Sequence, residues 1–180
     1  MSAKKIKPTK YTKTTILIVG EGPTEKAFLQ YLKELYVTRE ADFVIKVECG
    51  SGGGPKGVVQ KTVRLRSSRA YDRCFVLVDA DRPLETDSKL AERMHKKPRV
   101  EILKSTPCIE GLFLAILQHP NFSQKNTLSD NCKREFETNY ISDDKKTDKR
   151  SYADKFTRPI LDERRKNIQE LDAILKAMQV

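Results

Sequence analysis

The sequence predicts a three-layer α/β domain around a mainly parallel sheet of four strands. Its apolar runs are short and β-branched without polar alternation, which is typical of strands buried on both faces. Segments with helical spacing follow these runs, so strand and helix alternate along the chain. The 180 residues suffice for one domain with its own core, and two full domains are not expected.

The first strand and helix are predicted at the start of this pattern. Residues 14–20, "TTILIVG", form the strand. Pro23 suits the first position of a helix, and Glu25 lies in the first turn, where the helix dipole favours an acid. Apolar residues then recur at helical spacing: Phe28, Leu29, Leu32, Leu35 and Tyr36.

The later elements repeat this alternation up to residue 118, and beyond it the chain becomes polar. Further strands are predicted at 42–48, 73–79 and 99–105, and helices at 58–69, 86–96 and 108–118. The last segment, 158–180, has the spacing of one amphipathic helix face, which is a possible docking surface for a partner.

We therefore divide the chain into a basic flexible tail (1–13), a catalytic domain (14–120) and a polar and helical C-terminal extension (121–180) that packs on the same domain. The glycine-rich segment "GSGGGPKG" lacks the Gly-Lys-Ser/Thr ending of a P-loop, so a mobile loop is predicted there.

Composition favours a polyanionic partner. The chain has 35 Lys and Arg against 25 Asp and Glu, a net charge of +10, and nucleic acid is the first expectation. The alternative is that surplus lysine only maintains solubility. The four cysteines form no CxxC pair, so reduced thiols are expected rather than a zinc site or disulfides. No apolar run is long enough for a bilayer and no secretory signal is evident, so a cytoplasmic protein without a membrane anchor is expected.

Three acids follow predicted strands. Glu21 follows the first strand, and Asp79 and Asp81 lie at the end of the third. Function in parallel α/β sheets collects at the carboxyl ends of strands, so Glu21 joins the other two if these strands are neighbours. Carboxylates packed together need a cation or protons. Mg²⁺ is the natural candidate, because it links protein carboxylates to substrate phosphates. For Glu21 alone, an interaction with the helix dipole is an equally good explanation.

These residues resemble a known domain. A strand ending in Glu-Gly, a helix, and a later strand ending in Asp-x-Asp is similar to the Toprim domain of topoisomerases, primases, RecR-type proteins and OLD-family nucleases. "VGEGPTEKAFLQYL" and "LVDADRP" carry these features, and "STPCIEGLFLAIL" is similar to a segment of RloB-like proteins of restriction and defence loci. The resemblance covers residues 14–118 and implies a Rossmann-like Toprim fold.

The resemblance also implies roles for individual residues. Glu21 matches an acid/base or metal-proximal residue, and Asp79 and Asp81 match the metal-binding pair. Glu110 matches a later acid, as a possible ligand of a second metal. Glu25 matches a further site glutamate, and a helix cap is an equal alternative. The expected cofactor is Mg²⁺, for which Mn²⁺ is expected to substitute.

Basic residues near the predicted second helix are candidates for phosphate contacts, although a solvated helix face explains most of them as well. Arg82, directly after the Asp pair, is placed to steady a phosphate, and capping of a neighbouring acid is its alternative. The predicted nucleic-acid-binding set is Lys56, Lys61, Arg64, Arg69 and Arg82.

The favoured function is a Mg²⁺-dependent Toprim endonuclease that nicks or degrades DNA, or RNA as the second choice. The resemblance implies a bacterial defence effector that works with an ABC- or AAA-type ATPase. One alternative is a non-catalytic Toprim protein that binds nucleic acid or the ATPase. Another is a haloacid-dehalogenase-like phosphatase with Asp79 as nucleophile, Ser105 as its second motif and Asp143-Asp144 as the later acid pair.

Overall fold

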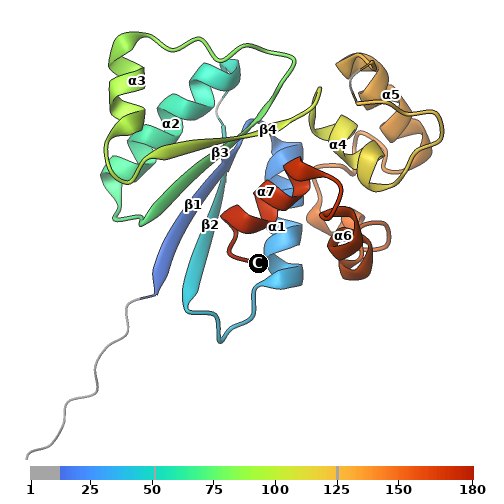
Figure 1. Cartoon of the computed structure of the whole chain (residues 1–180), viewed down its shortest axis with the longest axis horizontal. Helices are drawn as coiled ribbons and strands as arrows, with labels where there is room; N and C mark the ends of the chain where they lie inside the picture. The colour runs from blue at the N-terminus through green and yellow to red at the C-terminus, as the bar shows by residue number, and fades with distance from the viewer. Residues whose placement is uncertain (1–12, 51, 125) are drawn as a thin grey trace, which may run out of the picture.

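The computed structural model describes residues 13–50, 52–124 and 126–180, and it has the predicted α/β architecture (Figure 1). In the described part of the chain, four strands form one parallel sheet in the order β2-β1-β3-β4. The fold-class prediction is therefore confirmed. The predicted flexible tail lies outside the described residues, apart from Lys13. The elements are β1 (Thr14–Gly20), α1 (Pro23–Tyr36), β2 (Phe43–Cys49), α2 (Gly54–Ser68), β3 (Arg73–Asp79), α3 (Ser88–His95), β4 (Val100–Ser105), α4 (Ile109–Ile116), α5 (Ser129–Asn139), a 3₁₀ turn η1 (Lys149–Tyr152), α6 (Arg158–Arg164) and α7 (Gln169–Ala177).

Both faces of the sheet are covered by helices, as the uninterrupted apolar strands predict. Ile16 and Ile18 of β1 join the larger core, to which α1, α4, α5 and the C-terminal helices contribute. Leu17 and Val19 point the other way, into a smaller core with α2 and α3. Successive strand residues face opposite sides, so a strand between two helical layers needs apolar residues at every position.

The order of the strands creates a crevice at one edge of the sheet. The chain passes from β1 to β2 on one side, then crosses to β3 on the other side of β1. α1 covers one face and α2 covers the opposite face (Figure 1). At such a switch point, the loops that leave the two central strands diverge and leave an opening at their carboxyl ends.

The C-terminal extension shares the larger core with α1 and α4. Phe28 and Phe113 meet edge to face with ring centroids 4.7 Å apart, and Tyr152 and Phe156 pack against both. The Tyr31 hydroxyl donates a hydrogen bond of 2.7 Å to the carbonyl of Phe156. Residues from the extension therefore complete the core of the α/β unit.

The prediction of a single amphipathic helix over 158–180 is wrong in one respect. The segment forms two helices, α6 and α7, which Arg165 and the three residues after it separate. The Arg165 guanidinium donates to Asp172 and to the Val180 carbonyl, which ties α7 back beside the break.

The suggested docking surface on this segment is also wrong. The apolar side chains of α7 are buried in the chain's own core, because the break lets them turn onto the sheet instead of continuing along the axis of α6. The fully buried residues are Leu171, Ile174, Leu175 and Met178.

Candidate carboxylate site

The first two acids meet because β1 and β3 are hydrogen-bonded neighbours. The Glu21 amide continues the ladder by donating to the Leu77 carbonyl at 3.0 Å. The Glu21 side chain turns toward β3, where its Oε2 accepts from the Asp79 amide at 3.3 Å. The sequence predicted that Glu21 would join Asp79 if the first and third strands were neighbours, and these strands are neighbours.

Asp79 is the most tightly oriented carboxylate of the group. Its Oδ1 accepts hydrogen bonds from Ser105 Oγ and from the Ile109 amide, both at 3.0 Å. Register explains the first bond, because Asp79 pairs with Ser105 across β3 and β4. The pKa of Asp79 is raised to about 7, chiefly by burial and further by the charges of the neighbouring acids, although the Ser105 hydrogen bond acts to lower it.

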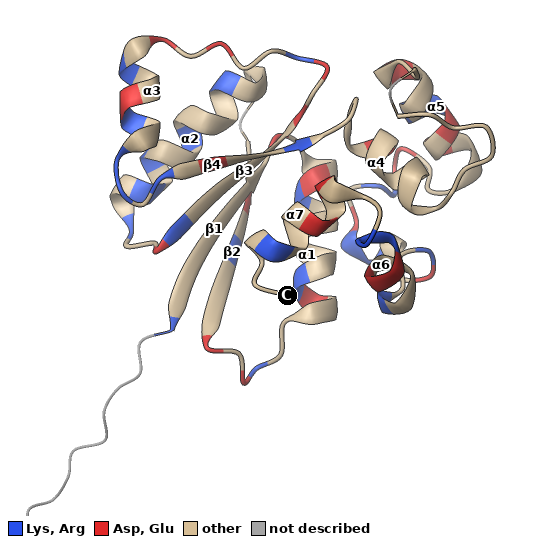
Figure 2. Ribbon diagram, viewed as in Figure 1, with Lys and Arg blue, Asp and Glu red and all other residues tan. Residues whose placement is uncertain are grey.

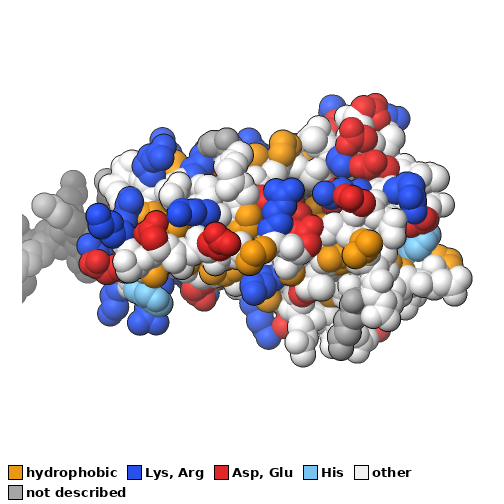
Figure 3. Space-filling model, turned by 90° about the horizontal axis from the view of Figure 1, so that it is seen from above, with side chains coloured by type: hydrophobic (Ala, Val, Ile, Leu, Met, Phe, Trp, Pro, Cys, Tyr) orange, Lys and Arg blue, Asp and Glu red, His pale blue; other side chains and the backbone are white. Residues whose placement is uncertain are grey.

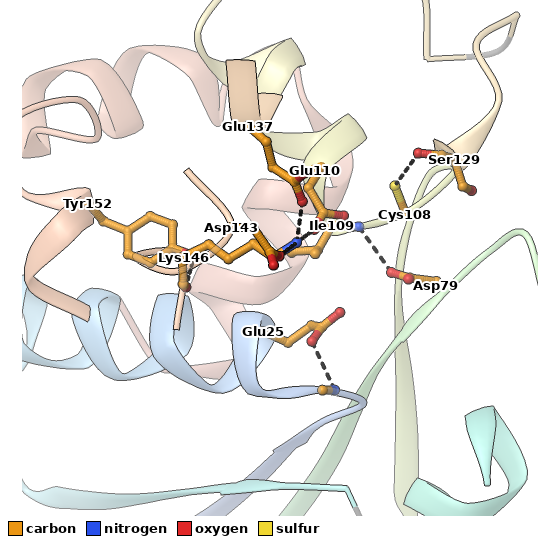
Figure 4. Close-up of polar contacts among 11 residues, drawn as sticks. Glu25, Asp79, Cys108, Ile109, Glu110, Ser129, Glu137, Asp143, Lys146 and Tyr152 are labelled. Atoms are coloured by element: carbon orange, nitrogen blue, oxygen red, sulfur yellow. Dashed lines mark hydrogen bonds and ion pairs between the residues drawn. The ribbon is translucent and has the colours of Figure 1, made fainter. Parts of the chain in front are cut away.

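Glu25 lies in the first turn of α1, where it both caps the helix and lines the pocket. Its Oε2 accepts from the Gly22 amide at 2.8 Å, so it caps the start of the helix. The side chain is nevertheless only 5% exposed and lines the pocket with the other acids (Figure 4). Burial and then the charge of Asp79 raise the pKa of Glu25 to about 7.

Glu110 is the most unusual acid of the site. It lies in the first turn of α4 and is 3% exposed. Its Oε1 lies 3.5 Å from the Nζ of Lys146. Its Oε2 is buried and has no hydrogen-bond partner among the described residues. A carboxylate oxygen buried in this way costs free energy unless a cation or donor reaches it.

Asp81 lies at the exposed rim. Its amide donates to the Pro107 carbonyl at 3.0 Å, and its carboxylate accepts from the Ser129 hydroxyl at the start of α5. The C-terminal extension therefore holds one member of the Asp-x-Asp pair.

All five predicted acids line one pocket of about 250 Å³ at the carboxyl edge of the sheet. Figure 3 shows acidic side chains in the middle of this face, with basic side chains beside them. Three cations also line the pocket, and two of them, Lys133 and Lys146, come from the extension. The complete lining is Glu21, Gly22, Thr24, Glu25, Asp79, Asp81, Arg82, Glu110, Lys133 and Lys146.

The chemistry of the pocket fits a hard divalent cation. The ligands are carboxylates, the Glu110 oxygen lacks a partner, and the pKa values of Glu25 and Asp79 are raised, which is the condition a cation relieves. Within the described residues, however, no three His, Cys, Asp or Glu side chains already surround a common ion position. An ion held by one or two of these carboxylates, with water as its other ligands, is the arrangement that Mg²⁺ commonly adopts.

The predicted nucleic-acid-binding residues are dispersed over the fold. Arg82 lines the pocket, whereas Lys56 forms an ion pair with Asp87 at 3.4 Å and Lys61 donates to the Cys49 carbonyl. Arg64 is exposed farther along α2, and Arg69 follows its last turn. Because α2 runs from the carboxyl edge of the sheet back to the opposite edge, Arg69 lies far from the acids. Figure 2 shows basic residues along α2 and α3, and their contact with nucleic acid stays a prediction.

Sequence reasoning missed Lys146 and the acid Glu137, and it considered their neighbour Asp143 only for the phosphatase alternative. They lie in a polar stretch whose charges have no periodicity, so no local signal separates them from solvated residues. Asp143 also bears on the phosphatase alternative. It follows α5 on a turn and pairs with Lys146 at 2.8 Å, instead of following a strand as a phosphatase acid pair would.

No helix in the described part of the chain has the length and apolar character needed to cross a bilayer. All four cysteines are free, as expected.

Comparison with known proteins identifies the family. Neither the curated proteins nor the solved structures compared with the chain give a match. A family model described as RloB-like protein matches residues 16–179, which include both the α/β unit and the extension. The chain therefore belongs to the RloB-like family.

Proposed function

We propose that this protein is a Mg²⁺-dependent endonuclease of the Toprim type, and that DNA is its preferred substrate. The observation that carries the proposal is the gathering of five carboxylates around one pocket, among them a Glu110 oxygen that is buried without a partner in the described chain. A net charge of +10 supports a polyanionic substrate. Acids inside a basic protein are the arrangement that metal-assisted phosphodiester hydrolysis uses.

Glu21, Asp79 and Asp81 would hold the ion, with Glu25 and Glu110 close by. When bound, Mg²⁺ would polarise the scissile phosphate and stabilise the charge on the leaving oxygen. Glu21 accepts a proton from the attacking water. Arg82 at the rim neutralises a phosphate oxygen. Ser105 and the Ile109 amide keep Asp79 oriented, since both donate to its Oδ1.

A biological role follows from the resemblance described above. We propose that the protein is an effector of bacterial restriction or defence, and that an ABC-type ATPase controls it. The chain carries no P-loop, because its glycine-rich segment lacks the required Lys-Ser/Thr ending. ATP hydrolysis in such a system would therefore come from outside these 180 residues.

The test is nicking of supercoiled plasmid by the full chain with Mg²⁺ or Mn²⁺, alone and with any ABC-type ATPase encoded beside it. Glu21→Gln and Asp79→Asn are compared with wild type, because each keeps the shape of its side chain. Asp72→Asn is the control: Asp72 precedes β3, at the opposite edge of the sheet. Both site variants are expected to be at least ~100-fold slower.

Cleavage that is indifferent to both substitutions would refute the nuclease site. Plasmid binding without cleavage, with or without the ATPase, would instead support a non-catalytic nucleic-acid-binding protein. Single-stranded RNA, tested in parallel, decides between the two substrate classes.

A further inference from the structure

Lys146 is a cation built into the carboxylate site by the C-terminal extension. It lies on the turn between α5 and η1, where its amide donates to the Ser142 carbonyl at 3.1 Å. The Tyr152 hydroxyl donates to the Lys146 carbonyl at 2.7 Å. Tyr152 is fully buried in the aromatic core, so the core itself fixes where the Lys146 backbone lies.

The Lys146 ammonium is surrounded as a metal ion would be. Its Nζ lies 2.8 Å from Asp143, 2.5 Å from Glu137 and 3.5 Å from Glu110. These acids come from the turn, α5 and α4, and Figure 4 shows them pointing toward Nζ from different sides. The contact with Glu137 is a hydrogen bond, and those with Asp143 and Glu110 are ion pairs, so three carboxylates share the charge of one ammonium. Burial acts to lower the pKa of Lys146, but the contacts with Asp143 and Glu137 and the charge of Glu110 outweigh it, so the pKa is raised.

Glu110 connects this ammonium with the pocket. Its Oε1 is the atom nearest Lys146, and its Oε2 is the buried oxygen without a partner among the described residues. In a site with two divalent ions, one carboxylate often bridges them. Here one oxygen of Glu110 already faces a positive charge, and only the other is left for an ion in the pocket.

We propose that the Lys146 ammonium takes the place of a second divalent cation, so that the pocket binds one divalent ion per chain. This inference rests on the proposed function, because it assumes an ion among Glu21, Asp79 and Asp81. It replaces the expectation that Glu110 is the ligand of a second metal. A divalent ion beside Glu137 and Asp143 would be repelled by an ammonium already held there.

The test counts Mn²⁺ ions bound to the full chain without substrate, by isothermal titration and by the electron paramagnetic resonance signal of free Mn²⁺. Wild type is expected to bind one Mn²⁺, and Asp79→Asn is expected to abolish that binding. Two ions per wild-type chain, both lost in Glu110→Gln, would overturn the inference and leave the proposed nuclease site standing. No binding at all would overturn both.

Variants of Lys146 make the test specific. Lys146→Met keeps the length of the side chain and removes its charge, which frees Glu137 and Asp143, so the count is expected to rise from one ion to two. Lys146→Arg keeps the charge and is expected to stay at one. A folded Lys146→Met protein that still binds a single Mn²⁺ would overturn the inference. If that variant does not fold, Lys146→Gln provides the second uncharged variant, and the wild-type count remains decisive.

Discussion

Replacing Asp79 by Asn is expected to stabilise the ion-free protein at neutral and alkaline pH. Asn keeps an Oδ1 that accepts from Ser105 and from the Ile109 amide, so the two hydrogen bonds to this position survive. The substitution removes a negative charge that burial and the neighbouring acids oppose. The carboxylate that the proposed chemistry needs is therefore a cost to the fold when no cation is bound.

The size of this effect follows from the pKa of Asp79. In the folded state it is raised from 3.8 to about 7, and each pKa unit corresponds to about 1.4 kcal/mol. The free-energy cost of ionising Asp79 in the folded state thus has an upper limit of roughly 4 kcal/mol. Screening by solvent in the open pocket reduces this cost to about 2 kcal/mol. For a chain of this size, that difference is about 4–8 °C in melting temperature.

The sign of the pH dependence is fixed because the folded state binds this proton more tightly than the unfolded state does. The stabilising contribution of the protonated Asp79 is complete below its unfolded pKa of 3.8, and it is lost as pH rises through about 7. The advantage of Asn over Asp should therefore be small near pH 4 and complete above pH 7.

Thermal unfolding followed by circular dichroism in EDTA, at about pH 4 and about pH 8, measures this difference. Asp72→Asn is the matched control of opposite sign, because hydrogen bonds from the Thr15 amide and hydroxyl lower the pKa of Asp72. That variant should gain nothing at pH 8. An Asp79→Asn protein that melts no higher than wild type at pH 8, or that gains equally at both pH values, would contradict this expectation.

Three further substitutions test how the site is held. Ser105→Ala removes the hydroxyl that donates to Asp79, so Mn²⁺ affinity measured by titration should fall about tenfold; an unchanged affinity would contradict this role. Tyr152→Phe removes the hydroxyl that donates to the Lys146 carbonyl, and it should lower the free energy of unfolding in urea by about 1 kcal/mol; no loss would mean that water replaces the bond. Gly111→Ala would place a Cβ 2.6 Å from a proline ring, so about 1–3 kcal/mol of destabilisation is expected in the same assay, and a neutral result would show that α4 can shift.

The sequence by itself determined the fold class and the central acids. Strands that pass between two helical layers must be apolar on both faces, so β1 and β3 were visible as short β-branched runs. The carboxyl ends of these strands lie at one edge of a parallel sheet. The strand boundaries alone therefore predict that Glu21 and Asp79 lie close together, once the two strands are neighbours. Helical period likewise located α1 and α4, although helix boundaries differ by a few residues from those predicted.

Only the tertiary structure decided how the C-terminal extension completes the site. Lys146 and Glu137 lie in a stretch without apolar periodicity. In such a stretch the local sequence does not distinguish a buried ion pair from a solvated charge. Their role depends on α5 and its turn packing beside α4, which brings the Lys146 ammonium to both Glu110 and Glu137. The break between α6 and α7 has the same origin: helical spacing continues through 158–180, but the chain must turn to bury the apolar side chains of α7 in the core. The local sequence determines whether a segment has the apolar spacing of a helix or a strand. The packing of elements that are distant in the chain determines which charged side chains meet.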